Sequence, residues 1–206
     1  MSEPTTIEVF ADVGCPFAHV GIERFVALRH RLGRDDVVLW VRSWPLEIVN
    51  GHPLDAHVIA EEVDEIREQV APDLFAGFAE AAFPSSTVPA MALAAAAYRH
   101  GPQVGERVSL ALRRALFEEG RDVADPAVLD EISRSEGIEV ADADAATVRA
   151  DHVEGAGRGV VGSPYFVTAA GSFFCPSLDV HRDDRGHLRI LADPEGFDEF
   201  LQSCFG

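Results

Sequence analysis

The chain of 206 residues contains no lysine, so all 17 of its basic side chains are arginines, against 35 acidic side chains. The formal net charge of −18 argues against nucleic acid as a partner, because phosphate groups would be repelled. No apolar run reaches the roughly 20 residues of a membrane-spanning helix. The first residues also lack the basic and apolar regions of a secretory signal. We therefore expect a cytoplasmic protein with no membrane partner.

Cysteine is scarce as well. Cys15, Cys175 and Cys204 form an odd set without paired spacing, which argues against a disulfide framework and against a zinc site. The histidines other than His19 show no metal-ligand spacing, so we expect no metal.

The most informative segment surrounds Cys15. An apolar run that begins at Ile7 breaks at Gly14, and a helical pattern starts directly after Cys15 with Pro16, a residue suited to the first helical position. A sulfur placed over the free N–H groups of a helix N-terminus is favoured as thiolate. The pattern predicts that Cys15 is a nucleophile with a pKa well below the usual value of about 8.5. The alternative is a buried packing cysteine beside a turn.

The order of elements predicts an α/β protein. A strand over 6–10, a helix over 16–32 and a strand over 36–40 form a β-α-β unit with parallel strands. Two short strands over 165–168 and 172–175 follow much later as a hairpin, and after a polar segment a helix closes the chain over 194–204.

Between these parts the pattern is almost wholly helical. Helices are predicted near 54–70, 72–81, 87–100, 103–119, 126–136 and 144–157. The fold class is therefore a thioredoxin-like fold (β-α-β … β-β-α) with a large all-helical insertion. We expect a thioredoxin-like domain over 1–53 and 158–206 and a helical insertion domain over 54–157.

Four segments carry a resemblance to a known family. They are Asp12–Phe17, Trp44–Leu46, Ala115–Val123 and Gly159–Phe166. In these four segments the chain resembles the DsbA-type thioredoxin proteins with a helical insertion. Among those proteins it is most similar to the FrnE-like branch. Relatives include 2-hydroxychromene-2-carboxylate isomerases and kappa-class glutathione transferases, so the resemblance implies one scaffold with several activities.

The resemblance assigns roles to two positions. Cys15 matches the nucleophile, and Pro164 matches the cis-proline that faces it across the site. An X-Pro bond adopts the cis conformation at modest cost in free energy. A cis bond here would expose the backbone of Ser163, which follows Gly162, so that it could pair with a bound thiol-containing peptide. The alternative is that Pro164 only begins an edge strand.

The chain departs from the redox members at Ala18, where they carry the second cysteine of Cys-x-x-Cys. A mixed disulfide on Cys15 must then be resolved by another thiol. Glutathione or mycothiol is one alternative. Cys175 is another, although hairpin pairing of Thr168 with Ser172 and the family's strand order put it about 10 Å from Cys15, beyond the reach of a disulfide.

Several further side chains are candidates for the site. His19, one helical turn after Cys15, is either a proton acceptor or a packed histidine. Ser177 matches the middle of a cofactor contact in glutathione-using relatives, but Pro176 and Leu178 do not match its flanks. The expected thiol- or substrate-binding residues are Asp12, Pro16, Phe17, Ala18, Trp44, Gly162, Ser163, Pro164 and Ser177.

Three functions remain open. The first is a thiol-disulfide oxidoreductase with a single active-site cysteine that works with a low-molecular-weight thiol. The second is a glutathione- or mycothiol-dependent isomerase or transferase, and the third is a non-catalytic binding module of the same fold. No tightly bound cofactor is expected, and glutathione or mycothiol would act as co-substrate. The resemblance leaves a homodimer open and does not identify the substrate.

Overall fold

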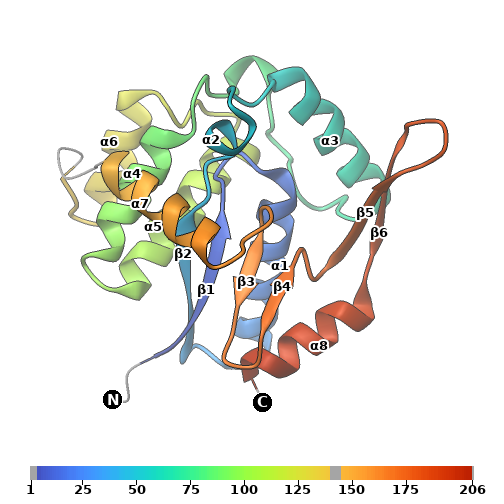
Figure 1. The fold of residues 1–206 in the computed structure, drawn as a ribbon. Helices are drawn as coiled ribbons and strands as arrows, with labels where there is room; N and C mark the ends of the chain where they lie inside the picture. Colours follow the sequence, from blue (N-terminus) through green and yellow to red (C-terminus); the bar gives the residue numbers. More distant parts are fainter. Residues whose placement is uncertain (1–3, 140–144, 206) are drawn as a thin grey trace.

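The computed structural model describes residues 4–139 and 145–205, which form a mixed sheet surrounded by helices (Figure 1). The sheet has the strand order β2-β1-β3-β4. β1 (Thr5–Ala11) pairs in parallel with β2 (Val37–Ser43) and antiparallel with β3 (Tyr165–Val167), which continues antiparallel to β4 (Ser172–Phe174). Strands from both ends of the chain thus share one sheet. The predicted thioredoxin-like α/β fold with a helical insertion is confirmed.

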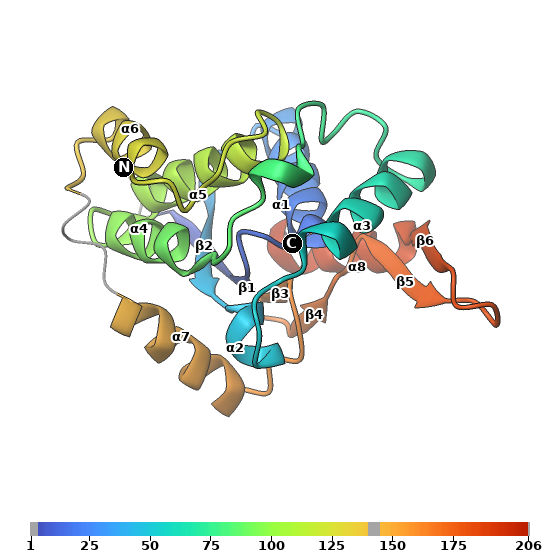
Figure 2. The same cartoon turned by 90° about the horizontal axis from the view of Figure 1, so that it is seen from above.

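Helices cover both faces of this sheet (Figures 1 and 2). α1 (Pro16–Arg31) and α8 (Pro194–Phe205) pack on one face, where Val9 of β1 shares a buried apolar cluster with Phe25 and Phe200. Phe10, the next residue of β1, faces the other side and packs there with Trp44. This alternation is the period of two expected when both faces of a strand are covered.

The inserted segment is mainly helical. It comprises α2 (Leu46–Asn50), α3 (Ala56–Gln69), η1 (Glu80–Ala82), α4 (Val88–Tyr98), α5 (Pro102–Phe117), α6 (Pro126–Ser135) and α7 (Ala145–Gly157). α4, α5 and α6 gather beyond the β2 edge, whereas α3 lies beside α1 (Figure 2). None of the helices in 4–139 and 145–205 combines the length and the apolar character needed to cross a membrane.

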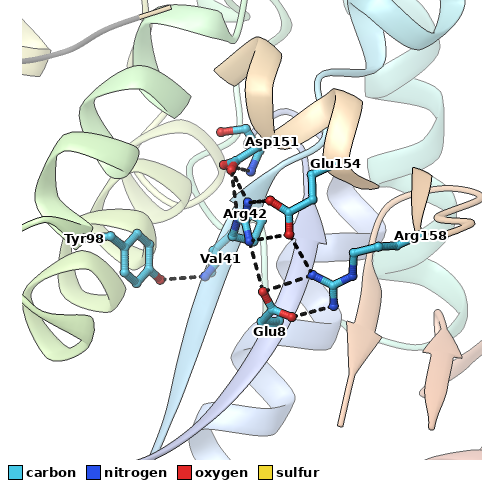
Figure 3. Close-up of polar contacts among 8 residues, drawn as sticks. Glu8, Val41, Arg42, Tyr98, Asp151, Glu154 and Arg158 are labelled. Atoms are coloured by element: carbon cyan, nitrogen blue, oxygen red, sulfur yellow. Dashed lines mark hydrogen bonds and ion pairs between the residues drawn. The ribbon is translucent and has the colours of Figure 1, made fainter. Parts of the chain in front are cut away.

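Ion pairs fix α7 on the sheet (Figure 3). Arg42 of β2 lies 2.6 Å from a carboxylate oxygen of Asp151 and 2.6 Å from one of Glu154, both on α7. The same guanidinium lies 3.1 Å from the Glu8 carboxylate of β1, and Arg158 lies 2.6 Å from Glu8. The network joins the two parallel strands to the last inserted helix.

The helix predicted near 72–81 is wrong, because this segment is a loop that ends in η1. The backbone N–H groups of Phe75 and Ala76 donate to the Glu118 carboxylate at 2.9 and 3.0 Å, and Phe75 has φ of 64°. Tertiary bonds to the end of α5 therefore take the place of helical ones. The short helix α2 was not predicted.

The hairpin register is shifted by one residue from the prediction. Val167 pairs with Ser172 and Tyr165 with Phe174, instead of Thr168 with Ser172. Thr168 belongs to the turn, since its N–H donates to the Gly171 carbonyl and its Oγ1 accepts from the Ala170 N–H.

A second hairpin occupies the predicted polar segment. β5 (Leu178–Arg182) and β6 (Leu188–Ala192) form a separate two-stranded antiparallel sheet beside α3. The Asp183 carboxylate organises its turn by accepting the N–H groups of Arg185 and His187. The sequence did not predict this hairpin, because charged residues are interspersed with the apolar residues that alternate along its two strands.

Candidate active site

Cys15 stands at the junction of β1 and α1. It is the N-cap residue of α1, with extended backbone (φ −84°, ψ 114°), and Pro16 follows at the first helical position. Its carbonyl accepts the His19 N–H at 3.1 Å, so the helix starts where the sequence predicts. The turn before it is tight, since a Cβ on Gly14 would lie 2.8 Å from the Thr87 side chain.

The loop before β3 lies against this cysteine. The Ser163–Pro164 peptide bond is cis, the conformation expected from the sequence. The Cys15 thiol donates to the Ser163 carbonyl oxygen at 3.3 Å, and the Ser163 Oγ accepts the Asp12 N–H at 3.0 Å. Segments 148 residues apart are thereby held together at one point.

The predicted low pKa of Cys15 is wrong. Burial raises the pKa of this thiol to about 11, since the residue is only 3% exposed and a thiolate there would lose its hydration. A hydrogen bond from the Ser163 side chain and one from the Ala18 N–H lower the pKa, and the nearby charges of Glu62 and Asp12 raise it again. The helix N-terminus is present, but removal from water outweighs it.

Two cavities open beside Cys15. One of about 290 Å³ is lined by Cys15 and Pro16, by Asp55 and Glu62 at α3, and by Ser163. A larger one of about 700 Å³ is lined by β4, by Cys175 and by residues at the start of α8. Phe17 and Ser163 line both cavities, whereas Cys15 lines only the smaller one.

A family model described as DSBA-like thioredoxin domain matches residues 6–182. The chain belongs to this family. No curated protein matches significantly.

Solved structures of the same fold have low sequence identity to this DSBA-like domain. The cytosolic disulfide reductase DsbM from Pseudomonas aeruginosa is 17% identical with a TM-score of 0.61, covering 96% of this chain and 97% of its own. A 2-hydroxychromene-2-carboxylate isomerase is 12% identical with a TM-score of 0.62, covering 82% and 88%. These likenesses show the fold.

Cys175 lies at the cis-proline end of the hairpin in this DSBA-like domain. Its N–H donates to the Pro164 carbonyl at 3.0 Å, its φ is 46°, and it lines the larger cavity. Burial and, as the smaller cause, the negative charge of an ionised Cys15 together raise its pKa to about 12. All three cysteines are free thiols.

His19 is packed beneath the site. Its Nε2 lies 2.6 Å from a Glu118 carboxylate oxygen, and its fully buried ring contacts the rings of Phe75 and Phe117. It lines neither cavity beside Cys15. This placement favours the packed-histidine alternative over a proton acceptor for Cys15.

Asp12 organises the loop and lines neither cavity beside Cys15. Its carboxylate accepts the Gly14 N–H at 2.8 Å and the Leu46 N–H at 2.7 Å, which connects the ends of β1 and β2. Complete burial raises its pKa. The expectation that Asp12 binds substrate gives way to a positioning role.

The other expected binding residues divide into two groups. Pro16, Phe17 and Ser163 line the Cys15 cavity, whereas Trp44 and Ser177 line neither cavity beside it. Trp44 packs edge-on against Phe10 and contacts the ring of His152. The Ser177 Oγ is buried beneath α1, 3.8 Å from the position of a Cβ on Gly21.

Gly162, Pro164 and Ala18 shape the site by packing. A Cβ on Gly162 would lie 2.5 Å from the Phe174 ring, so glycine lets that ring approach the loop before Pro164. Ala18 is fully buried, and its N–H reaches the Cys15 sulfur.

Arg113 of α5 is a residue of the site that the sequence analysis missed. Its Nη1 donates to the Asp12 carbonyl at 2.7 Å, the side chain is fully buried, and its charge interacts with Cys15 and Asp12. Arg113 follows Ser109 by four residues and precedes Leu116 by three, so it lies on the buried face of α5 with them. This spacing is the sequence signal that could have identified Arg113.

Glu62 is a second site residue that the sequence did not identify, because the acidic run around it is typical of a solvent-exposed helix face. Burial at the Cys15 cavity raises its pKa to about 7. Within the described residues, no group of three or more His, Cys, Asp or Glu side chains could hold a metal ion.

Proposed function

We propose that this DSBA-like protein is a thiol-disulfide exchange enzyme that uses Cys15 as its single nucleophile and a low-molecular-weight thiol to complete the reaction. The observation that carries the proposal is the position of the Cys15 sulfur, 3.3 Å from the Ser163 carbonyl beside the cis-proline, in a residue that lines the smaller cavity. Ala18 stands where the redox members carry a second cysteine, so in this proposal an external thiol takes the place of that cysteine.

The proposed chemistry has two balanced steps. The Cys15 thiolate attacks one sulfur of a disulfide, forms a mixed disulfide, and releases the other sulfur as a thiolate. A small thiolate then attacks the outer sulfur of the mixed disulfide, which returns the Cys15 thiolate and forms a new disulfide. Each step exchanges one S–S bond for another.

Glutathione and mycothiol are the two candidates for the small thiol in this role. One structure of the same fold is described as DsbM with GSH; it is 17% identical with a TM-score of 0.60. The 290 Å³ space at Cys15 offers room for a small thiol, and it shares Phe17 and Ser163 with the 700 Å³ space. We propose a cytoplasmic setting, consistent with three cysteines that are all free thiols.

A thiol-dependent isomerase or transferase is the second candidate. Because burial raises the pKa of Cys15 to about 11, its S–H is a donor at neutral pH and could hold the thiolate of a cofactor without forming a disulfide. In this candidate no covalent adduct with Cys15 is needed.

Intact mass spectrometry after incubation with glutathione disulfide or mycothiol disulfide separates these candidates. We expect one adduct per chain, mapped to Cys15 by peptide analysis, and none in the Cys15→Ser variant. Failure to form an adduct with either disulfide, while either reduced thiol binds non-covalently, would favour the isomerase or transferase. A Cys15→Ser protein that binds its ligands unchanged would favour the non-catalytic module.

A further inference from the structure

The walls of both cavities carry charge of one sign. Asp55 and Glu62 line the cavity at Cys15, and Asp179, Asp193 and Glu199 line the larger one. No arginine of the described residues lines either cavity, and the chain contains no lysine. His52 is the only histidine among the described lining residues.

Two arginines lie near the site without lining these spaces. Arg113 interacts with Cys15, but it is fully buried and accompanied by the carboxylate of Asp12. Arg182 is within electrostatic range of Glu62, but it lines the adjacent groove between α3 and the second hairpin. A molecule that approaches Cys15 through the smaller cavity therefore meets Asp55 and Glu62, and a part of it that extends past Phe17 and Ser163 into the larger cavity meets further carboxylates.

We propose, on the basis of the proposed exchange function, that the disulfide and thiol substrates of Cys15 are uncharged or cationic, and that anionic ones such as glutathione are disfavoured. Carboxylates at the walls repel an anionic reactant during encounter and attract a cationic one. Each carboxylate about 8 Å from a unit charge changes the rate about twofold in water, and more where water is excluded. Several such groups together give a measurable preference, which salt reduces.

The substrate class follows from this charge. Glutathione carries two carboxylates for one ammonium group, whereas a sugar-based thiol such as mycothiol carries no carboxylate. An uncharged small disulfide or a disulfide in a basic peptide would also fit. The proposal concerns the charge class, so it does not depend on which of these thiols is present.

The test compares two methanethiosulfonates of similar size. The 2-(trimethylammonium)ethyl and the 2-sulfonatoethyl reagents each transfer a thioalkyl group to a thiolate and release methanesulfinate, so both form a mixed disulfide with Cys15. The protein carries Cys175→Ser and Cys204→Ser to leave one thiol. Rates are measured at pH 8, above the Glu62 pKa of about 7, and each is divided by the rate with 2-mercaptoethanol.

We expect a normalised preference of about tenfold for the cationic reagent at low salt. Glu62→Gln and Glu199→Gln should each reduce it at least twofold. The matched control is Glu139→Gln, an exposed carboxylate that lines neither cavity, and it should leave the preference within a factor of about 1.5. A second comparison uses glutathione disulfide and its fully esterified form. The rate of the ester divided by the rate of glutathione disulfide should be larger with the protein than with a free thiol.

A normalised preference of threefold or less overturns the proposal, as does an equal loss of preference in all three carboxylate variants. Failure of Cys15 to react with either reagent, while the unfolded chain reacts with both, contradicts the proposed exchange function itself. The two failures are thus distinguishable.

Discussion

At the scale of single residues, Cys15 shows that position and environment act on a thiol in opposite directions. The helix N-terminus and the Ala18 N–H favour the thiolate, whereas burial to 3% exposure disfavours it. Burial is the larger effect, and the pKa rises to about 11. Burial therefore limits how much thiolate is available for exchange, and buried charges close to the sulfur adjust that amount.

Arg113 provides a test of this control. Replacing it by methionine in Arg113→Met removes a buried cation that interacts with Cys15 and leaves the Asp12 carbonyl with only the longer bond of 3.4 Å from the Cys15 N–H. We expect the pKa of Cys15 to rise further and the free energy of unfolding to fall by about 3 kcal/mol. The pH dependence of iodoacetamide alkylation measures the first effect, and urea unfolding measures the second.

The adjacent Arg114 is the matched control. Its guanidinium is half-exposed and pairs with Glu23 at 2.7 Å, so Arg114→Met should cost less than about 1 kcal/mol and leave the alkylation profile unchanged. Equal alkylation profiles for Arg113→Met and the parent protein would contradict the role given to Arg113.

At the scale of elements, long-range polar bonds place segments whose own patterns are weak. α7 has little amphipathic character, with Val148, Asp151 and Gly155 as its buried residues. Its position depends on the Arg42 network and on close packing, since a Cβ on Gly155 would lie 2.9 Å from the rings of Phe10 and Trp44. The helix should therefore loosen on its own when the network is cut.

Arg42→Met cuts this network. We expect a loss of about 2 kcal/mol in the free energy of unfolding, because Asp151 and Glu154 lose their shared cation while partly buried. Hydrogen exchange should rise chiefly within α7. Arg107→Met, which removes an exposed pair with Glu136, is the control and should cost less than about 1 kcal/mol. Uniform exchange changes across the molecule would show that α7 does not depend on this network.

The elements also show how far sequence reasoning reaches. Cys15–Pro16 predicts the start of α1, and Asp125–Pro126 predicts the start of α6, because capping is a local property. The loop over 72–79 could not be predicted in the same way. Its backbone bonds go to Glu118, about 40 positions later, and such a partner leaves no mark in the local pattern.

At the scale of the whole molecule, the site forms where distant parts of the chain meet. β1 with α1 supplies Cys15, the loop before β3 supplies Ser163 and Pro164, and the inserted helices supply Glu62 and Arg113. The sequence motifs identified the first two contributions. The positions of Glu62 and Arg113 depend on how the insertion packs. The same is true of the packed ring of His19 and of Trp44, which lies on the opposite face of the sheet.

The central claim is that Cys15 exchanges disulfides with an external thiol in place of an internal partner. The most direct measurement follows intact mass over time, in the parent protein and in Cys175→Ser/Cys204→Ser, first with a small disulfide and then with its reduced thiol. We expect both proteins to gain one adduct and to lose it when the thiol is added. A parent protein that sheds the adduct without added thiol, and ends two hydrogens lighter with Cys15 joined to Cys175, would contradict it.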